Sequence, residues 1–217
     1  MYICNMRYDK YSYIFPPRPK NAIPYSNITL WDNGQMIGQP KMNGSNCVIF
    51  TDGSSYKVMG RHNQILSNFQ LSKSELSEIY RPVNGGWLVI NGEYLNKNKL
   101  DENGSPFNHK LIIFDILVHE SDHLVGSTFI DRIDLLDKLY GQDECEKNYL
   151  YKYTDNIYRV KSYKNDFERI FNDLTKIDVI EGIVFKRKNA RLELGTTENN
   201  NAKSMVKARK PTKNYRF

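Results

Sequence analysis

Gln39-Pro40-Lys41-Met42-Asn43-Gly44-Ser45-Asn46 is the stretch around which the rest of the chain is organised. It lies between two apolar runs that are typical of strands, and its single lysine is followed by small polar residues. A lysine that attacks an electrophile must be partly neutral, which requires a desolvated or electropositive pocket. Gly44 lets the backbone approach a bulky ligand, and the short polar side chains supply hydrogen-bond donors. The alternative is an ordinary turn at a strand end, so the rest of the chain must decide.

The composition is that of one globular domain. The chain has 217 residues, of which 40% are apolar and 26% charged, and this is enough for one sizeable core. No apolar run reaches the length of a membrane span, and the N-terminus carries no signal-peptide core. Cys4, Cys47 and Cys145 are scattered, which favours reduced thiols. We therefore expect a cytoplasmic protein without a membrane partner, and a virus or phage is one source that fits.

The positive charge is concentrated near the C-terminus. The formal charge at pH 7 is +6. Residues 186–217 contain the cations Lys186, Arg187, Lys188, Arg191, Lys203, Lys207, Arg209, Lys210, Lys213 and Arg216 against the acids Glu193 and Glu198. A basic end on a folded domain indicates a polyanionic partner such as nucleic acid, or a pocket for nucleotide phosphates. The alternative is a solvated basic tail.

The pattern of apolar residues predicts an α+β domain, mainly antiparallel, with helices on the outside. Expected strands cover 28–31, 47–50, 56–59, 87–93, 111–117, 158–160, 180–186 and 204–208, and expected helices cover 72–80, 128–140 and 166–176. Asp52-Gly53 is a hairpin turn, and residues 96–109 form a surface loop. Residues 1–34 are rich in Tyr and Pro, which favours an extended wrapping segment, and 35–217 form the compact domain.

One tempting motif is discounted. The stretch 119–123 spells H-E-x-x-H, which on a helix would place His119 and His123 on one face to bind zinc. A β-branched apolar run leads into it and Leu124-Val125-Gly126 follows, so we expect a loop after a strand. The other histidines lie in polar loops, and no spacing marks a third ligand. We therefore do not expect a zinc protease.

Polar residues, together with one aromatic residue, recur at strand ends and in the adjoining turns. They are Lys41, Asn43, Asn46, Arg61, Glu93, Phe114, Asp115, Glu181, Lys186, Lys203, Lys207 and Arg209. Cations of this kind neutralise a triphosphate, a carboxylate holds a divalent metal, and an aromatic ring stacks on a base. The set therefore favours nucleotidyl transfer, and Gln39 adds an amide that can pair with the edge of adenine.

The order of these residues resembles the covalent nucleotidyltransferases, which are the ATP-dependent DNA ligases, the RNA ligases and the mRNA capping enzymes. The matching stretches are Lys41-Met42-Asn43-Gly44 (K-x-(D/N/H)-G), Gly60-Arg61-His62-Asn63, Ile90-Asn91-Gly92-Glu93 (L-D-G-E), Phe114-Asp115-Ile116-Leu117 (F-D-I-L), Glu181-Gly182-Ile183-Val184-Phe185-Lys186-Arg187 (E-G-(L/I)-V-x-K-R) and Lys203-Ser204-Met205-Val206-Lys207-Ala208-Arg209 (R-S-x-x-x-K-x-K). The resemblance covers residues 35–210. Each stretch is short, and their common order makes the resemblance specific.

The resemblance implies an antiparallel-sheet, ATP-grasp-like adenylyltransferase domain with peripheral helices and no C-terminal OB domain. Lys41 would be the nucleophile, assisted by Lys186, Lys207 and Arg209. The residues expected to bind ATP are Gln39, Lys41, Asn46, Arg61, Glu93, Phe114, Glu181, Lys186, Lys203, Lys207 and Arg209. Mg²⁺ or Mn²⁺ would be held by Glu181, by Asn43 through a water, and by Asp115.

Departures from the family pattern bear on the substrate. DNA ligases and capping enzymes usually carry Asp at the position of Asn43, and DNA ligases carry Arg at that of Asn46. Gly-Ser-Asn instead resembles the G-(S/T)-N of the RNA ligase 2 branch, and Arg209 replaces a lysine. The chain ends where DNA ligases and capping enzymes append an OB fold, whereas the I-N-G-E and F-D-I-L strands are more similar to DNA ligases.

We therefore expect a monomeric, ATP-dependent polynucleotide ligase that forms lysyl-AMP and joins 5′-phosphate to 3′-hydroxyl ends, with RNA favoured. The basic end, with Tyr215 and Phe217, would track a strand. Alternatives are a DNA ligase, a capping guanylyltransferase that uses GTP, and a nucleic-acid-binding relic of the fold.

Overall fold

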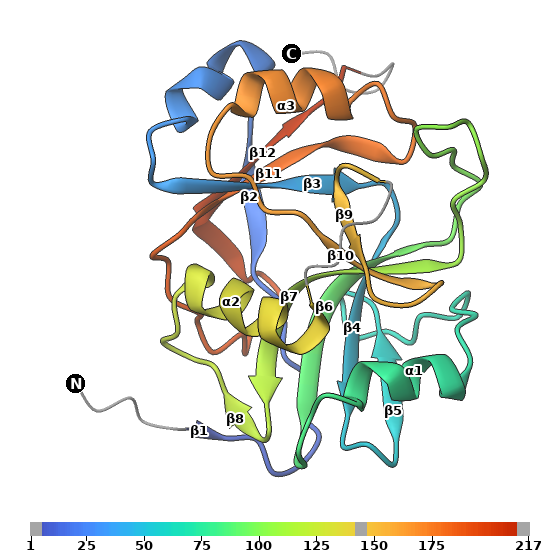
Figure 1. The fold of residues 1–217 in the computed structure, drawn as a ribbon. Coiled ribbons are helices and arrows are strands. Elements are labelled where there is room, and N and C mark those ends of the chain that lie inside the picture. Colours follow the sequence, from blue (N-terminus) through green and yellow to red (C-terminus); the bar gives the residue numbers. More distant parts are fainter. Residues whose placement is uncertain (1–5, 142–146, 212–217) are drawn as a thin grey trace.

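Two β-sheets form the body of the protein, and helices cover their outer sides (Figure 1). A computed structural model describes residues 6–141 and 147–211. The large sheet has the order β1 (Met6–Arg7), β8 (Asp122–His123), β7 (Lys110–His119), β6 (Leu88–Leu95), β4 (Ser45–Thr51) and β5 (Tyr56–Met59), with β10 (Ile157–Val160) and β9 (Leu150–Lys152) branching from β7. The small sheet has the order β2 (Arg18–Ile23), β12 (Asn201–Arg209), β11 (Ile180–Arg187) and β3 (Met36–Met42). Cys4, Cys145, Lys213, Tyr215, Arg216 and Phe217 lie outside the described residues.

The helices begin at the capping signals that the sequence carries. Ser72 caps α1 (Lys73–Tyr80) in a reciprocal capping box with Glu75. Thr128 caps α2 (Phe129–Tyr140) in the same way with Asp131, and α2 ends at Gly141. In α3 (Phe167–Leu174) the buried residues are Phe167, Ile170, Phe171 and Leu174, which form one apolar face. These three helices confirm the predicted ones.

The N-terminal stretch differs from the prediction. Residues 25–31 form a 3₁₀-helix, η1 (Tyr25–Trp31), where a strand was predicted at 28–31, and β2 is a regular strand in a stretch predicted to be irregular. Ile28 is fully buried in the core with Phe171 of α3, so tertiary packing overrides the β-propensity of the sequence. In Figure 1, η1 and α3 lie together above the small sheet.

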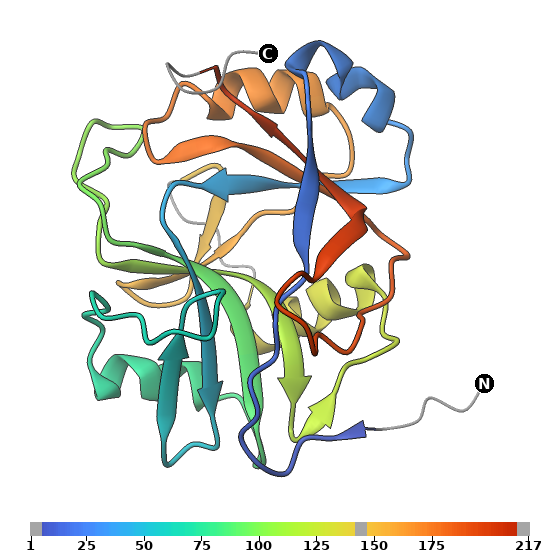
Figure 2. The same ribbon diagram turned by 180° about the vertical axis from the view of Figure 1, so that it is seen from behind.

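The sheets are mainly antiparallel, as predicted, with two parallel pairings among the described strands. β10 pairs parallel with β7, and β2 pairs parallel with β12. Figure 2 shows β2 in blue running beside β12 in red. Parallel neighbours need long connections, so no local turn signal announces them. The second of these pairings brings the N-terminal segment next to the closing strand.

The hydrophobic core has a part on each sheet. One cluster joins the small sheet to α3 and η1 and also includes Leu95, Ile112 and Tyr158 of the large sheet, and a second joins the large sheet to α1 and α2. Cys47 is a buried free thiol within the second cluster. Over the described ranges, no helix has the length and apolar character needed to cross a membrane.

Two irregularities in the strand ladders lie where the predicted site residues fall. In the β3–β11 ladder, Ile180 pairs with Met42 and Gly182 with Lys41, so Glu181 is an extra residue between them. In the β6–β7 ladder, Asn91 pairs with Asp115 and Gly92 with Ile113, which leaves Phe114 as the extra residue. A bulge bends its strand locally and redirects a side chain.

Candidate active site

A cavity of about 270 Å³ is lined by residues of both sheets. The small sheet contributes Gln39, Pro40, Lys41, Met42, Val184, Lys186, Asn201, Met205, Lys207 and Arg209, and the large sheet contributes Asn46, Asn91, Glu93 and Phe114. Residues 16–20, Arg61 and Glu198 complete the lining. The cations clearly outnumber the carboxylates, so the cavity is built to receive an anion.

The small sheet presents its site residues in two adjacent rows. Lys41 pairs with Gly182, which pairs with Arg209 on the other side. One step along the strands on the same face, Gln39 pairs with Val184, which pairs with Lys207. Paired residues share a face and successive residues alternate, so all these side chains point to the same side of the sheet.

Lys41, which lines this cavity, contacts a carboxylate. Its Nζ donates a hydrogen bond to Oε2 of Glu181, and the two side chains are 20% and 28% exposed. Nε of Arg209 lies 3.7 Å from the same oxygen. The bulge at Glu181 allows this contact, since a regular ladder would place residue 181 on the opposite face. The negative charge of Glu181 therefore partly offsets the positive charges of Lys41 and Arg209.

The Gln39 side chain is buried, and only one of its two polar atoms makes a hydrogen bond within the described residues. Its Nε2 donates to Oγ of Ser162 at 3.1 Å. Its Oε1 is buried and has no hydrogen-bond partner within the described ranges. A buried carbonyl oxygen without a partner is costly, so the site is suited to a ligand that offers an N–H donor.

On the large sheet, Asn46 and Glu93 face each other across the β4–β6 ladder. Nδ2 of Asn46 donates to Oδ1 of Asn91 at 2.9 Å and to the carbonyl of Gly92 at 3.2 Å, while its Oδ1 is buried without a partner in the part of the chain that is described. Burial raises the pKa of Glu93 to about 7, and the nearby Glu181 acts in the same direction against the opposing charge of Lys41.

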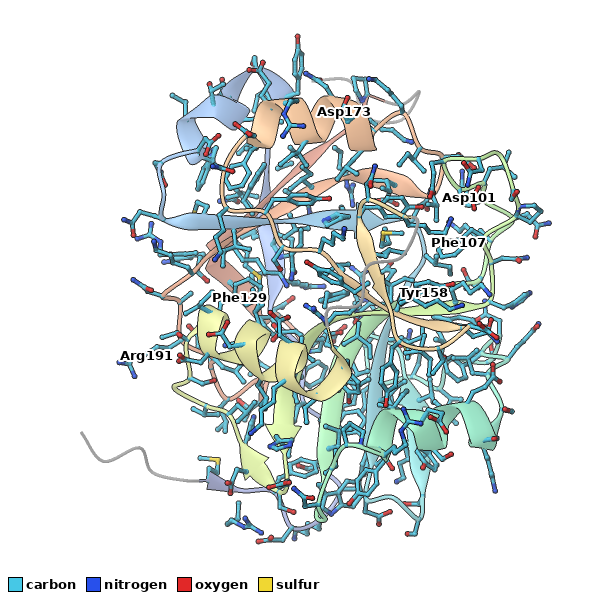
Figure 3. The ribbon with its side chains drawn as sticks, in the orientation of Figure 1. Asp101, Phe107, Phe129, Tyr158, Asp173 and Arg191 are labelled. Carbon is cyan, nitrogen blue, oxygen red and sulfur yellow. The ribbon has the colours of Figure 1, made fainter. Side chains whose placement is uncertain are left out.

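Lys186 is almost fully buried between two aromatic rings. Its Nζ lies 4.9 Å from the ring centre of Phe114 and 4.5 Å from that of Phe129. Figure 3 shows Phe129 at the start of α2, at the level between the two sheets. Burial lowers the pKa of Lys186 to about 8, although the carboxylate of Asp115 favours the charged form. The lysine can therefore lose its charge close to neutral pH.

Lys207 completes the positive field. It is partly buried, and its Nζ donates to the carbonyl of Pro19 at 3.2 Å. Burial lowers the pKa of Lys207, and the charges of Arg209, Lys41 and Arg61 lower it further. Like charges held close together repel unless an anion lies among them.

The cavity gathers most of the predicted residues. Gln39, Lys41, Asn46, Arg61, Glu93, Phe114, Lys186, Lys207 and Arg209 line it, and Glu181 contacts Lys41. Four predicted residues are not among the lining residues: Glu181, Asn43, Asp115 and Lys203. The N–H of Asn43 donates to Val179 at 2.9 Å, and Lys203 is exposed.

Asp115 has a different environment from the one predicted. Its carboxylate oxygens accept from Nε and Nη2 of Arg132 on α2 at 2.8 and 3.2 Å, and both side chains are buried. The carboxylate is thus engaged by a guanidinium beneath the cavity. We leave Asp115 out of the proposed metal site.

The donor set bears on a metal ion and on the H-E-x-x-H stretch. No group of three or more His, Cys, Asp or Glu side chains that could hold a metal occurs over residues 6–141 and 147–211. A single carboxylate at Glu181 fits Mg²⁺, which binds through one or two carboxylates together with substrate phosphates. His119 and His123 lie in the β7–β8 hairpin, where His123 pairs with Val118, so they face opposite sides.

Several cavity residues were not predicted. Residues 16–20 and Asn91 line the cavity, and Ser162 orients Gln39 from outside it. Glu198 also lines it and accepts a 2.6 Å contact from Nδ1 of His62, next to Arg61. The Ile90-Asn91-Gly92-Glu93 stretch carried a signal for Asn91. The others are brought in by contacts distant in sequence.

The chain is similar to proteins that are already known. A model of the RNA ligase family matches residues 34–209. Among solved structures, a mycobacterial DNA ligase D complexed with ATP and MES aligns with a TM-score of 0.64 and 17% identity over 90% of this chain and 60% of that one. The ligase domain of M. tuberculosis LigD gives 0.65 and 18% over 90% and 59%.

An archaeal ATP-dependent RNA ligase aligns with a TM-score of 0.51 and 16% identity over 89% of this chain and 47% of that one. None of the curated proteins compared with the chain matches it. The chain therefore spans about 60% or less of the length of these three structures, and at such identities the likeness shows a shared fold.

Proposed function

This chain belongs to the RNA ligase family, and from that premise we propose that it is an ATP-dependent polynucleotide ligase that works as a monomer through a lysyl-AMP intermediate on Lys41. The observation that carries the proposal is the position of the Lys41 amine. It lies in a cavity lined by further cations, beside the carboxylate of Glu181. A nucleophile surrounded by groups that neutralise phosphate is what adenylyl transfer requires.

In the proposed first step, the Lys41 ammonium loses one proton to solvent, and the neutral amine then attacks the α-phosphorus of ATP. The N–P bond forms while the bond from that phosphorus to the bridging oxygen breaks. The electron pair leaves with pyrophosphate, and the proton of the amine passes to solvent. Lys186, Lys207 and Arg209 offset charge on the α-phosphoryl oxygens as it develops.

The next two steps move AMP and then release it. The 5′-phosphate of a strand attacks the lysyl-AMP phosphorus, and Lys41 leaves with a proton. The 3′-hydroxyl of the other strand then attacks that 5′-phosphate, a phosphodiester forms, and AMP departs. The cations of the cavity would stabilise both steps, because in each step negative charge develops on a phosphate close to Lys41.

Recognition of ATP would involve two side chains at the base and three at the sugar and phosphates. Gln39 has its amide nitrogen tied to Ser162, so its free oxygen is ready to accept from the exocyclic amine of adenine. Guanine presents a carbonyl oxygen at the same position, and two acceptors repel. Phe114 would stack on the base, and Glu93 would accept from the ribose hydroxyls. Asn46 and Arg61 would add contacts to the sugar and phosphates.

A divalent cation, Mg²⁺ or Mn²⁺, would supply positive charge at the α-phosphate when bound. Glu181 would hold it directly, and Asn43 through a water. Both residues adjoin Lys41, on β11 and at the end of β3. Lys203 is exposed, and we propose that it meets the outer phosphates.

RNA is the proposed preferred substrate, and DNA is the second candidate. The family match and the side chains Asn43 and Asn46 support RNA. The mycobacterial DNA ligase D, whose fold this chain shares, supports DNA. The experiment is to incubate the protein with ATP and Mg²⁺ on nicked duplex RNA, nicked DNA and single-stranded RNA, each with 5′-phosphate and 3′-hydroxyl ends.

We expect sealing of an RNA substrate by the native protein and none by Lys41→Arg. Sealing of nicked DNA alone would move the assignment to a DNA ligase. Adduct formation with GTP in place of ATP would indicate a capping guanylyltransferase. Salt-dependent RNA binding without any adduct would indicate a relic of the fold.

A further inference from the structure

The N-terminal segment supplies two cations to the cavity, and the proposed function gives neither of them a role. Arg18 and Lys20 belong to β2 and line the cavity together with Lys41 and Lys207. β2 reaches this position through its parallel pairing with β12, where Arg18 stands opposite Asn201. A sequence-distant segment that adds positive charge to an already positive cavity is costly unless it meets an anion.

Arg18 is held in place by neutral groups. Its Nε donates to Oδ1 of Asn201 at 3.1 Å, and its Nη2 donates to Oδ1 of Asn199 at 3.2 Å. A guanidinium has five N–H donors, so these two bonds orient it and leave donors for a ligand. Among the ion pairs of the described residues, none joins Arg18 or Lys20 to a carboxylate. Glu198, a carboxylate that also lines the cavity, contacts His62.

Arg18 is close enough to the cations of the cavity to change the pKa of Lys207. After burial and three other cations, the charge of Arg18 also lowers the pKa of Lys207. The backbone of the segment is tied to the same lysine, since Nζ of Lys207 donates to Pro19 at 3.2 Å. The two cations therefore lie beside the residue proposed to contact the α-phosphate.

The strand order of the small sheet places Lys41 and the two N-terminal cations at opposite edges. Lys41 lies on β3 at one edge, and Arg18 and Lys20 lie on β2 at the other, with β11 and β12 between them. Neighbouring strands are ~4.8 Å apart, so the two edges are separated by roughly 14 Å. Extended side chains from both edges and a phosphate chain between them fill that span.

Phosphoryl transfer requires the attacking and leaving groups to be roughly in line through phosphorus. With Lys41 attacking from the β3 edge, the leaving group must depart toward β12 and β2. We propose that Arg18 and Lys20 form a phosphate subsite opposite Lys41, which binds the pyrophosphoryl group of ATP in the first step. The strand's 5′-phosphate enters the same subsite when it displaces Lys41, because that attack also comes from the side opposite the lysine.

This inference rests on the proposed function for its chemistry, and pyrophosphate binding tests it separately. The variants are Arg18→Gln and Lys20→Gln. Arg169→Gln is the matched control, since Arg169 is an exposed arginine on α3, away from the cavity. Thermal unfolding of each variant checks that the fold is intact.

Binding and rate measurements on these variants test the subsite. We expect Arg18→Gln to weaken binding of inorganic pyrophosphate by roughly ten- to a hundredfold, the loss expected for a hydrogen bond to a charged group. The rate of lysyl-AMP formation from ATP and the reverse reaction of the adduct with pyrophosphate should fall by similar factors. AMP transfer to a 5′-phosphorylated strand should also slow. Binding of a 5′-hydroxyl strand and all properties of Arg169→Gln should not change.

Pyrophosphate binding equal to that of the native protein would overturn the inference. So would an equal loss of affinity for the 5′-hydroxyl strand, which would make the segment a general nucleic-acid surface. A native protein that binds pyrophosphate through Arg18 but never forms the adduct would sink the proposed function and leave the subsite standing.

Discussion

Lys41 and Glu181 form an ion pair even though the strand register places Gly182, and not Glu181, opposite Lys41. The contact exists because β11 carries one extra residue at this point, and the bulge turns the carboxylate to the side of the amine. The glycine that follows makes this possible. An added Cβ at Gly182 would lie 2.0 Å from the carbonyl oxygen of Ala208.

Gly182→Ala tests the bulge. Gly182 has a backbone φ of +155°, which residues with a side chain rarely adopt. The added methyl group would also push β12 away from β11, because it would meet the carbonyl oxygen of Ala208. We expect a loss of unfolding free energy of about 3 kcal/mol or more from strain and broken pairing, and a large fall in lysyl-AMP formation. Denaturant unfolding measures the first. Gly104→Ala, at φ +72° in open space, should cost only about 1 kcal/mol. Equal losses in both variants would contradict the role of the close contact.

The Asp115–Arg132 pair should be structural. Both side chains are buried and joined by two hydrogen bonds. Arg132→Leu should lower the unfolding free energy by about 3–5 kcal/mol, because it leaves an unpaired buried carboxylate. The double variant with Asp115→Leu should recover most of that loss. A double variant as unstable as the sum of the single ones would contradict this account.

Loss of the Lys186 charge should make the rate of adenylylation fall at alkaline pH. Burial lowers its pKa to about 8, so in the ligand-free protein its charge is present below that pH and is lost above it. The second-order rate constant for adduct formation reports the free enzyme and should fall as pH rises through about 8. Lys186→Arg stays charged and should remove the fall, even if its rate is lower throughout. An unchanged fall in Lys186→Arg would assign this pH dependence to another group.

Glu93 should make stability depend on pH. Burial raises its pKa from the usual 4.5 to about 7, so the folded state binds more protons than the unfolded state between those values. The contribution of Glu93 to unfolding free energy should therefore fall as pH rises from 4.5 to about 7, and then level off. Glu93→Gln should lack this dependence. The difference between the two proteins in denaturant unfolding across that range isolates the effect, and a difference that is flat with pH would contradict it.

Much of the fold could be predicted because its signals are local. The caps Ser72 and Thr128, the Asp52-Gly53 turn and the short apolar runs in β4 and β7 mark their elements within a few residues. The ordered motifs likewise placed Lys41 and Glu93 together, since each lies on a strand whose position the family pattern predicts.

The parts that could not be predicted depend on contacts between distant segments. Pro19 meets Lys207 across 188 residues through a parallel pairing that leaves no turn signal, so residues 16–20 read as an irregular Pro-rich stretch. Ile28 sits in a run with strand propensity but packs in a 3₁₀-helix against α3. Arg132 captures Asp115 only because α2 lies on β7.

The measurement that tests the central claim most directly is covalent labelling of the protein by ATP. The native chain and Lys41→Arg are incubated with α-labelled ATP and Mg²⁺, denatured, and the labelled peptide is identified. We predict an acid-labile phosphoramidate on Lys41 in the native protein and no label in the variant, which keeps the positive charge beside Glu181. No label on the native protein, or label that persists in Lys41→Arg, would contradict the account.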